Sequence, residues 1–330
     1  MGWRPVVTRV KRGWKMPSHS VDAGRRRTPM AIRALATGAM LVAGLYVAVC
    51  LYAANALSVT GAHKPLTATA ASIDSNWRDV SFPSRLDHIT LRGWLFNAGA
   101  AGGRSVIILH GFTANRTDEG FGEPQMARDF IAAGYDTLVF DFRSFGLSDG
   151  DRFTIGSAEG RDVLGAYDFM KVQGYDPHRM AILGVSMGAE SMLGVAEQLS
   201  DVAALIADSA YADLRPILNL DITRYSHLPG IFNPGIIAAG QLFYGLSPDF
   251  RPIDHVRALP ARAFLFLVGG SDNFIPTDNS VQLKAASANP ETRLVIFAGS
   301  DHAKEFHDQT GRYLETVLSF INDQITEKLG

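Results

Sequence analysis

A Gly-x-Ser-x-Gly string contains the serine with the clearest potential for chemistry. Residues 184–188 read Gly-Val-Ser-Met-Gly, with Ser186 at the centre. An apolar segment precedes the string and a helical pattern follows it, so the two glycines permit a turn too tight for a Cβ and leave Ser186 at its tip. A serine hydroxyl is a poor nucleophile by itself. It needs a base, an acid that orients the base, and donors for an oxyanion.

Two later segments offer the acid and the base. Asp272 follows an apolar run at residues 263–268, and His302 follows another at residues 293–297. A histidine on that loop can face Ser186 across the strand ends, accept its proton and return it to the leaving group. Asp208, which closes an earlier apolar run, is a rival for the acid. Asp301 is badly placed for that role because it is adjacent to His302 in the chain.

Two backbone amides are predicted to form the oxyanion hole. Phe112 lies in Leu-His-Gly-Phe-Thr at residues 109–113, directly after a third apolar run, and Met187 follows Ser186. Backbone N–H groups suit this task because their positions are set before charge develops. His110 is interpreted as a residue that shapes this loop, and His307, inside a helical pattern, as a surface residue.

The elements that must position these residues follow from the hydrophobic pattern. Two alternating segments, at residues 77–82 and 89–96, predict an antiparallel start to a sheet. Short apolar runs separated by helical patterns then predict a mostly parallel sheet with helices on both faces. The runs are 105–109, 137–140, 180–183, 203–207, 263–268 and 293–297, and the helices are 123–133, 157–173, 189–199, 279–288 and 304–323. In such a sheet, ligand sites lie beyond the carboxyl ends of the strands.

One long connection interrupts this alternation, at about residues 209–261. It is rich in Pro, Leu, Ile, Phe and Tyr. A connection of this length in a compact domain is usually functional or disordered, and apolar content argues against disorder. We interpret it as a small helical cap over the strand ends. The alternative is that these residues extend the core.

The N-terminal region predicts a membrane anchor. Residues 1–33 carry nine Lys or Arg and one acidic residue, and residues 34–62 contain no Asp, Glu, Lys, Arg or His. As a helix, residues 34–57 would extend roughly 36 Å, enough to cross a hydrocarbon core of about 30 Å. The basic cluster before the span predicts a cytoplasmic N-terminus and an extracytoplasmic remainder. Cleavage at the small-x-small string of residues 54–56, which would give a secreted protein, is the alternative.

These boundaries predict four segments. They are a basic cytoplasmic tail at residues 1–33, a transmembrane helix at 34–57, a linker at 58–75 and a catalytic domain at 76–330. After residue 33 the chain has 22 basic and 32 acidic residues, which argues against a nucleic-acid partner. Cys50 is the single cysteine, so an intrachain disulfide and a cysteine-based metal site are excluded.

The motifs together resemble those of the α/β-hydrolase fold over roughly residues 75–326. The order Ser186, Asp272, His302 matches the order in that superfamily. Within it, the chain is similar to bacterial serine esterase and lipase-like enzymes, a group that includes serine aminopeptidase-like hydrolases and membrane-anchored members. The stretches that carry the resemblance are residues 91–95, 110–112, 141–148, 184–188, 270–272 and 301–302.

The resemblance implies hydrolysis of a carboxylic ester, either small or lipid-like, through an acyl-enzyme on Ser186. It implies no metal and no organic cofactor. A peptidase or amidase of the same fold is the main alternative, and a non-catalytic scaffold is a second one. The motifs specify fold and triad but not substrate, since one scaffold hosts many reactions. Oligomeric state is not specified either.

Overall fold

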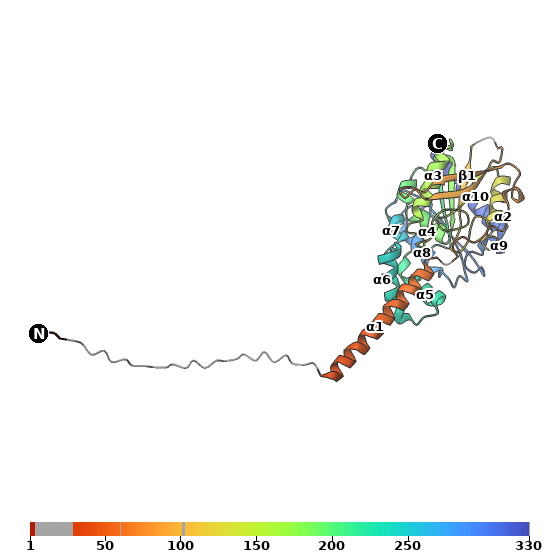
Figure 1. Cartoon of the computed structure of the whole chain (residues 1–330). Helices are drawn as coiled ribbons and strands as arrows, with labels where there is room; N and C mark the ends of the chain where they lie inside the picture. Colours follow the sequence, from red (N-terminus) through yellow and green to blue (C-terminus); the bar gives the residue numbers. More distant parts are fainter. Residues whose placement is uncertain (4–28, 60, 101–102, 330) are drawn as a thin grey trace. The chain divides into compact units, whose positions relative to one another are not determined.

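The computed structural model describes residues 1–3, 29–59, 61–100 and 103–329 (Figure 1). Residues 4–28, most of the predicted basic tail, lie outside this part of the chain. Two compact units are present, residues 1–45 and residues 46–330. The candidate site belongs entirely to the second unit.

A sheet of eight strands, within the described residues, forms the centre of the second unit. The spatial order is β1-β2-β4-β3-β5-β6-β7-β8. β2 runs antiparallel to both of its neighbours, and the pairs from β4 onward are parallel. The predicted antiparallel start and parallel continuation are therefore confirmed. The strands are β1 (Trp77–Pro83), β2 (Thr90–Phe96), β3 (Ser105–Leu109), β4 (Asp136–Asp141), β5 (Met180–Val185), β6 (Ala204–Asp208), β7 (Leu265–Gly269) and β8 (Arg293–Phe297).

The central strands are apolar throughout because both faces of the sheet are covered. In β3, Ile107 and Leu109 enter one hydrophobic core, whereas Val106 and Ile108 enter the other. Successive side chains of a strand point to opposite faces, so each face needs its own helices. The first core packs against α3 (Gly160–Val172), α4 (Met187–Leu193), α7 (Pro252–Arg257) and α8 (Asp278–Ala286), and the second against α2 (Glu123–Ala132), α9 (Glu305–Asp308) and α10 (Thr310–Leu329).

Two of the predicted helices are each split in two. The helix expected over residues 189–199 is α4 followed by the 3-10 turn η3 (Ala196–Leu199). Gly194 ends α4, and a Cβ there would lie 2.5 Å from the ring of Phe250. The helix expected over 304–323 is α9 and α10, because Gln309 leaves helical geometry at φ −140° and ψ 48°.

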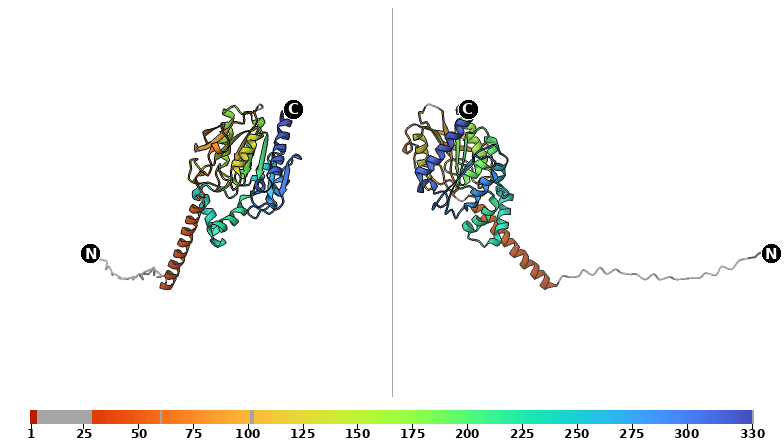
Figure 2. Two further views of the ribbon diagram at one scale, coloured as in Figure 1. Left: turned by 90° about the vertical axis from the view of Figure 1, so that its right-hand side faces the viewer. Right: turned by 180° about the vertical axis from the view of Figure 1, so that it is seen from behind.

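The long connection after β6 forms the predicted helical cap in part. It contains α5 (Leu214–Ser226), the 3-10 turn η4 (Gly230–Phe232), α6 (Asn233–Tyr244) and α7. α5 and α6 lie together at one end of the sheet, beside the end of α1 (Figure 2). Their buried residues form a third hydrophobic cluster, separate from the two sheet cores. Ile253 and Val256 of α7 instead join the first core, so this helix extends the core and is not part of the cap.

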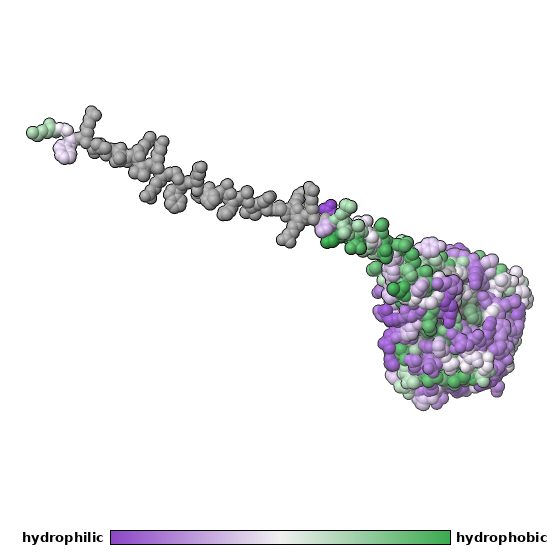
Figure 3. All heavy atoms as spheres, turned by 90° about the horizontal axis from the view of Figure 1, so that it is seen from below, coloured by the Kyte–Doolittle hydropathy of each residue, from purple (hydrophilic) through white to green (hydrophobic). Residues whose placement is uncertain are grey.

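Helix α1 (Met30–Leu57) begins four residues before the predicted span and ends where the span was predicted to end. An 18-residue window of it has a mean hydropathy of 2.1, and its length and composition would allow it to cross a membrane. Its side chains over residues 30–45 are exposed and mostly apolar (Figure 3). A signal sequence satisfies the same criteria.

The stretch predicted as a linker is part of the second unit and packs into its second core. Ala70 and Ile73 are buried in the second core, around the 3-10 turn η1 (Ala70–Ser72). Thr67 Oγ1 donates to the carbonyl oxygen of Thr117 at 2.8 Å, and the Nδ2 group of Asn115 donates to the carbonyl of Lys64 at 3.1 Å. These contacts tie the chain that follows α1 to the loop after β3.

A buried ion pair links the loops that follow β3 and β4. Arg116 Nη1 lies 2.7 Å from Asp141 Oδ2, and the two side chains are 2% and 0% exposed. Asp141 also accepts the backbone N–H groups of Arg116 and Leu147 at 2.9 and 2.8 Å. The Arg116 guanidinium lies over the ring of Trp94, 4.4 Å from its centroid. Asp141 therefore has a structural role, holding these two loops together.

We predict that Arg116→Met lowers the free energy of unfolding by about 3–5 kcal/mol at neutral pH, because it leaves the Asp141 carboxylate buried without a counter-charge. Adding Asp141→Asn should recover part of this loss, since the buried charge is then gone. Urea unfolding of the detergent-solubilised chain, followed by circular dichroism, measures both values. A double variant no more stable than Arg116→Met would contradict this account.

Candidate active site

The turn between β5 and α4 has the geometry of a nucleophile elbow. Ser186 has φ 49° and ψ −121°, a conformation that non-glycine residues rarely adopt. A Cβ on Gly184 would lie 2.5 Å from the backbone carbon of Gly188, and a Cβ on Gly188 would lie 2.5 Å from the carbonyl oxygen of Leu109. Both glycines are therefore required by close backbone approach. The Ser186 N–H donates to the carbonyl of Asp208 at 2.8 Å and ties the turn to β6.

Three predicted residues meet at the carboxyl ends of the strands. Ser186 Oγ lies 3.0 Å from Nε2 of His302, and Nδ1 of the same ring lies 2.8 Å from Asp272 Oδ2. Ser186 follows β5, Asp272 follows β7 and His302 follows β8. Parallel strands end at one edge of a sheet, which is why residues 116 positions apart are neighbours.

The loop after β7 holds Asp272 in a fixed orientation. Its Oδ1 accepts the backbone N–H groups of Phe274 and Ile275, each at 2.8 Å, which leaves Oδ2 for the histidine. The Asp272 side chain is 0% exposed. The ring of Phe274 lies against the ring of His302 with 4.7 Å between centroids. These contacts fix the carboxylate that holds His302 Nδ1 and cover one face of the imidazole ring.

The two amides predicted for the oxyanion hole follow the neighbouring strands β3 and β5. Met187 is the first residue of α4, where N–H groups have no partner within the helix. Phe112 follows the end of β3, which is the direct neighbour of β5. Among the described residues, neither N–H donates to a backbone acceptor outside its own helix or strand. Both amides are thus available to a ligand.

His110 shapes the loop that contains Phe112. Its Nε2 accepts the N–H of Phe142 at 3.0 Å, so Nδ1 carries the hydrogen and donates to the carbonyl of Gly111 at 2.8 Å. Complete burial lowers the pKa of His110 to about 4, which keeps the ring neutral. This arrangement agrees with the loop-shaping interpretation of the sequence.

The other sequence candidates have different partners. Asp208 accepts a hydrogen bond from the Tyr313 hydroxyl at 2.8 Å. Asp301 accepts the backbone N–H of His302 at 2.8 Å and so shapes the loop. His307 is exposed and its Nε2 lies 2.6 Å from the carbonyl oxygen of Glu119.

A buried carboxyl cluster behind the histidine was missed by sequence reasoning. Ser209 Oγ lies 3.1 Å from both Asp208 Oδ1 and Glu305 Oε1, and it accepts the N–H of Ala303 at 3.1 Å. Its single hydrogen can serve only one carboxyl, so a second hydrogen must come from a protonated acid. Burial, followed by the nearby Asp208 charge, raises the pKa of Glu305. Glu305 therefore carries the proton, and the cluster anchors the residue after His302.

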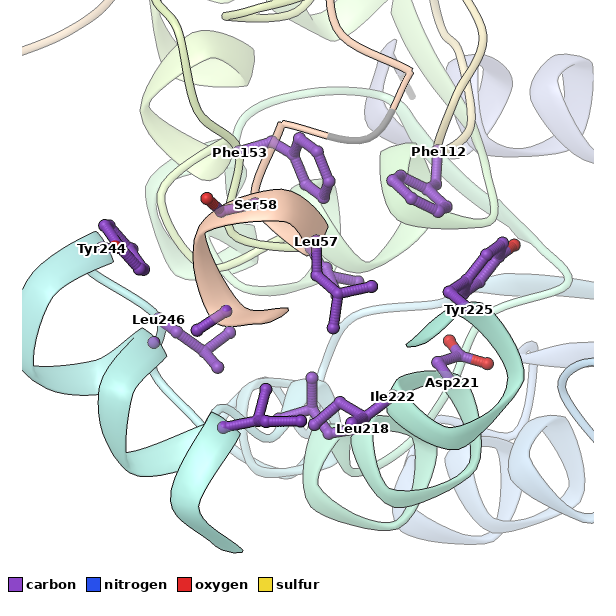
Figure 4. Close-up of a pocket in the computed structure, with 14 residues that line it drawn as sticks. Leu57, Ser58, Phe112, Phe153, Leu218, Asp221, Ile222, Tyr225, Tyr244 and Leu246 are labelled. Atoms are coloured by element: carbon purple, nitrogen blue, oxygen red, sulfur yellow. The ribbon is translucent and has the colours of Figure 1, made fainter. Parts of the chain in front are cut away.

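An apolar pocket lies under the cap, with about 650 Å³ of empty space including the part open to solvent (Figure 4). Ser186 and His302 do not line it; the side chain of Phe112 does, so the pocket begins beside one predicted oxyanion donor. The ring of Tyr225 meets Phe112 edge to face, with 5.8 Å between centroids. The lining is Ala54, Leu57, Ser58, Phe112, Phe153, Ile155, Leu218, Asp221, Ile222, Tyr225, Ile236, Gly240, Tyr244 and Leu246.

Two parts of this lining had no signal in the sequence. One is the end of α1, which was expected to serve only as an anchor. The other is the loop with Phe153 and Ile155, where Glu159 accepts the backbone N–H groups of residues 154 and 156 at 2.8 Å each. The Tyr211 hydroxyl donates to the carbonyl of Ile155 at 2.6 Å.

Charged groups in the pocket are few. The Asp221 carboxylate lines the wall and accepts a hydrogen bond from Arg224 Nη1 at 2.9 Å. Burial raises the pKa of Asp221 to about 6, against the lowering effect of Arg224. Within the described part of the chain, no group of three or more His, Cys, Asp or Glu side chains is placed to hold a metal ion.

A family model described as alpha/beta hydrolase family matches residues 106–315, which contain all three residues of the hydrogen-bonded chain. The chain belongs to the alpha/beta hydrolase family. Membership supports a hydrolytic activity on a small-molecule substrate. It does not by itself identify the substrate, because this scaffold hosts many reactions.

Similar proteins include the uncharacterized protein Rv2307c of Mycobacterium tuberculosis. It is 29% identical over 236 residues, which cover 71% of this chain and 75% of that protein. A 2-hydroxy-6-oxo-6-(2'-aminophenyl)hexa-2,4-dienoic acid hydrolase of Metapseudomonas resinovorans is 31% identical over 133 residues, covering 38% of this chain and 44% of that enzyme.

Among solved structures, the Pyrococcus furiosus esterase Pf2001 superimposes with a TM-score of 0.67 at 19% identity. The match covers 80% of this chain and 98% of the esterase. At this identity the likeness shows a shared fold. The alpha/beta hydrolase fold predicted from the sequence is thereby confirmed.

We predict that Glu305→Gln stabilises the protein increasingly as pH rises above about 4.5. When a carboxyl has a higher pKa in the folded protein than in the unfolded chain, it lowers the free energy of unfolding. This loss is absent below the pKa of the unfolded chain and grows with pH until the folded pKa is passed. An amide can still donate to Ser209, but it never ionises. Thermal unfolding at pH 5 and pH 8 measures the difference, and Glu315→Gln, exposed on α10, is the matched control. A Glu305→Gln effect equal at both pH values would contradict the assignment of the proton.

Proposed function

We propose that this protein is a serine hydrolase that cleaves carboxylic esters, with Ser186 as nucleophile, His302 as base and Asp272 as the orienting acid. The observation that carries the proposal is the pair of hydrogen bonds from Ser186 Oγ to His302 at 3.0 Å and from His302 to Asp272 at 2.8 Å. Nucleophile, base and orienter within this reach define the arrangement that activates a hydroxyl.

The reaction proceeds through an acyl-enzyme. Ser186 Oγ forms a bond to the ester carbonyl carbon while its proton passes to His302 Nε2. The C–O bond to the alcohol then breaks, and His302 returns the proton to the leaving oxygen. Water adds to the acyl carbon with His302 again as base, and the acid leaves as Ser186 regains its hydrogen. Asp272 holds the tautomer and stabilises the imidazolium that forms at each step.

Phe112 and Met187 stabilise the oxyanion through their backbone N–H groups. Among the described residues, neither N–H donates to a backbone acceptor outside the helices and strands, and the two residues follow the adjacent strands β3 and β5. Loss of one such donor typically costs about 3–4 kcal/mol of transition-state stabilisation. The contact of Gly188 with the backbone of Leu109 keeps the two loops close.

The pocket favours an ester with an apolar acyl chain over a peptide. Its walls are formed largely by Leu, Ile, Phe, Tyr and Ala side chains. Recognition of a peptide terminus would require an unpaired charge, and the Asp221 carboxylate is already hydrogen-bonded to Arg224. Burial of apolar surface is therefore the main source of binding free energy available here.

We also propose that α1 anchors the enzyme in a membrane, with the N-terminus cytoplasmic and the hydrolase unit extracytoplasmic. The basic residues before the helix support this orientation. Retention of the helix is supported by the burial of Cys50, Ala53 and Ala54, which are 3%, 6% and 4% exposed. Cleavage after residue 56 would remove these side chains from the third hydrophobic cluster.

We predict that Ser186→Ala reduces hydrolysis of p-nitrophenyl butyrate by about 10³-fold or more, because no other group in the site replaces the hydroxyl. Asp272→Asn should reduce the rate of this hydrolysis by a comparable factor, since an amide favours the wrong tautomer of His302. Both variants should keep the thermal stability of the parent chain. Ser247→Ala, at an exposed serine of the same unit, is the control. Turnover near the parent rate for Ser186→Ala would reject this nucleophile.

We predict that kcat/KM rises with acyl length from the acetate to the octanoate p-nitrophenyl ester, by at most about fourfold per methylene, since each buried methylene contributes about 0.8 kcal/mol. Leu218→Trp fills the pocket and should abolish the rise. Leu220→Trp is the matched control because Leu220 is 52% exposed on the same helix. A flat profile in the parent enzyme would remove the acyl-pocket assignment but leave Ser186 as nucleophile.

A further inference from the structure

The end of α1 is built into the cap as a structural component. The Tyr46 ring stacks on Phe232 with 5.1 Å between centroids, and its hydroxyl donates to the carbonyl of Ile231 at 3.0 Å. Cys50 lies so close to Gly235 that a Cβ there would be 2.5 Å from its sulfur. The last three turns of this apolar helix therefore belong to the same packed cluster as α5 and α6.

This packing makes the helix one wall of the acyl pocket. Ala54, Leu57 and Ser58 line the pocket. Figure 4 shows Leu57 pointing into the space that Tyr225, Ile222 and Leu218 surround. An acyl chain in this pocket would contact the anchor helix directly.

A second depression, which we name the helix groove, runs along the same part of α1. It has about 930 Å³ of empty space, including the part open to solvent. It shares Leu57 and Tyr225 with the acyl pocket, so these two side chains form the boundary between groove and pocket. The groove is lined by Ala48, Val49, Tyr52, Ala53, Ala56 and Leu57 of α1 and by Tyr225, Ser226 and Leu228.

With α1 spanning a membrane as proposed above, the position of the groove along the helix corresponds to a membrane boundary. A helix needs about 20 apolar residues to cross the hydrocarbon core. Counted from Ala34, the first residue after the charge of Arg33, that length ends near Ala53. The groove residues from 48 to 57 therefore straddle the far edge of the hydrocarbon layer, the depth at which acyl chains meet their headgroups.

We propose that the substrate is an acyl ester lipid of the extracytoplasmic leaflet, and that its acyl chain passes along the helix groove, between Leu57 and Tyr225, into the pocket. This inference rests on the proposed ester hydrolysis and on the proposed membrane anchor, and it adds the substrate class and its route. Along this route the chain would meet mainly apolar side chains, because groove and pocket adjoin at Leu57 and Tyr225. Hydrolysis at Ser186 releases a free acid and the alcohol part of the lipid, with water supplying the hydroxyl and the hydrogen.

The test compares two substrates of the full-length protein in phosphatidylcholine vesicles. One is a long-chain monoacylglycerol carried in the vesicles, and the other is p-nitrophenyl butyrate, which reaches the site from water. Ala56→Trp places an indole in the helix groove. We expect the ratio of the monoacylglycerol rate to the butyrate rate to fall by about fivefold or more. A fivefold fall corresponds to the loss of burial of little more than one methylene of the acyl chain.

Two further variants make the result specific. Ala48→Trp enters the same groove farther from the pocket, where the parent alanine is exposed, and should lower the ratio in the same direction. Ala43→Trp adds the same indole to an exposed position of α1 outside the groove and should leave the ratio unchanged. Labelling of Ser186 by a fluorophosphonate confirms that each variant is folded.

The outcomes separate the two proposals. Unchanged ratios in both groove variants, or an equal fall for Ala43→Trp, would overturn the route through the groove. Hydrolysis of the butyrate ester without hydrolysis of the monoacylglycerol by the parent enzyme would overturn the lipid substrate and leave the esterase intact. Absence of both hydrolysis and fluorophosphonate labelling in the parent would reject the proposed function itself.

Discussion

The close approach of backbone at residues 184–188 is the constraint on which the rest of the structure depends. Ser186 holds a positive φ of 49°, a conformation that costs about 1–3 kcal/mol for a residue with a side chain. The surrounding contacts offset that cost, because the Ser186 N–H bonds to β6 and Gly188 touches the end of β3. The hydroxyl is thus raised above the strand ends, where loops from β3, β7 and β8 can reach it.

Buried polar groups around this turn hold loops in place rather than react. His110 is neutral and joins the loop after β3 to the loop after β4, while Asp141 pairs with Arg116 beneath them. Glu305, protonated beside Ser209, fixes the backbone next to His302. A loop built from such interactions can keep an amide or an imidazole in position without a regular secondary structure.

The apolar helix and the cap form one packed cluster, and this joins two properties that are usually separate. Length and hydropathy alone mark α1 as a candidate membrane span and indicate no part in a pocket. Here Leu57 lines the pocket, and Cys50, Ala53 and Ala54 are buried against the cap. The position of the pocket relative to the end of the apolar helix is therefore set by packing. In the proposed ester hydrolysis, an apolar acyl chain can therefore approach the pocket from the side formed by α1.

The sequence by itself determined the sheet and its antiparallel start, because strand periodicity and the paired glycines are local patterns. It also indicated the residues that meet at the carboxyl edge, because their order matches that of the α/β-hydrolase fold. It could not determine where α4 and α9 end, because those breaks depend on Phe250 packing on Gly194 and on the geometry at Gln309. Nor could it reveal that Glu305 is protonated or that α1 forms a wall of the pocket, because both depend on contacts between residues far apart in the chain. Burial and side-chain contact are properties of the folded chain, so only the tertiary structure decided them.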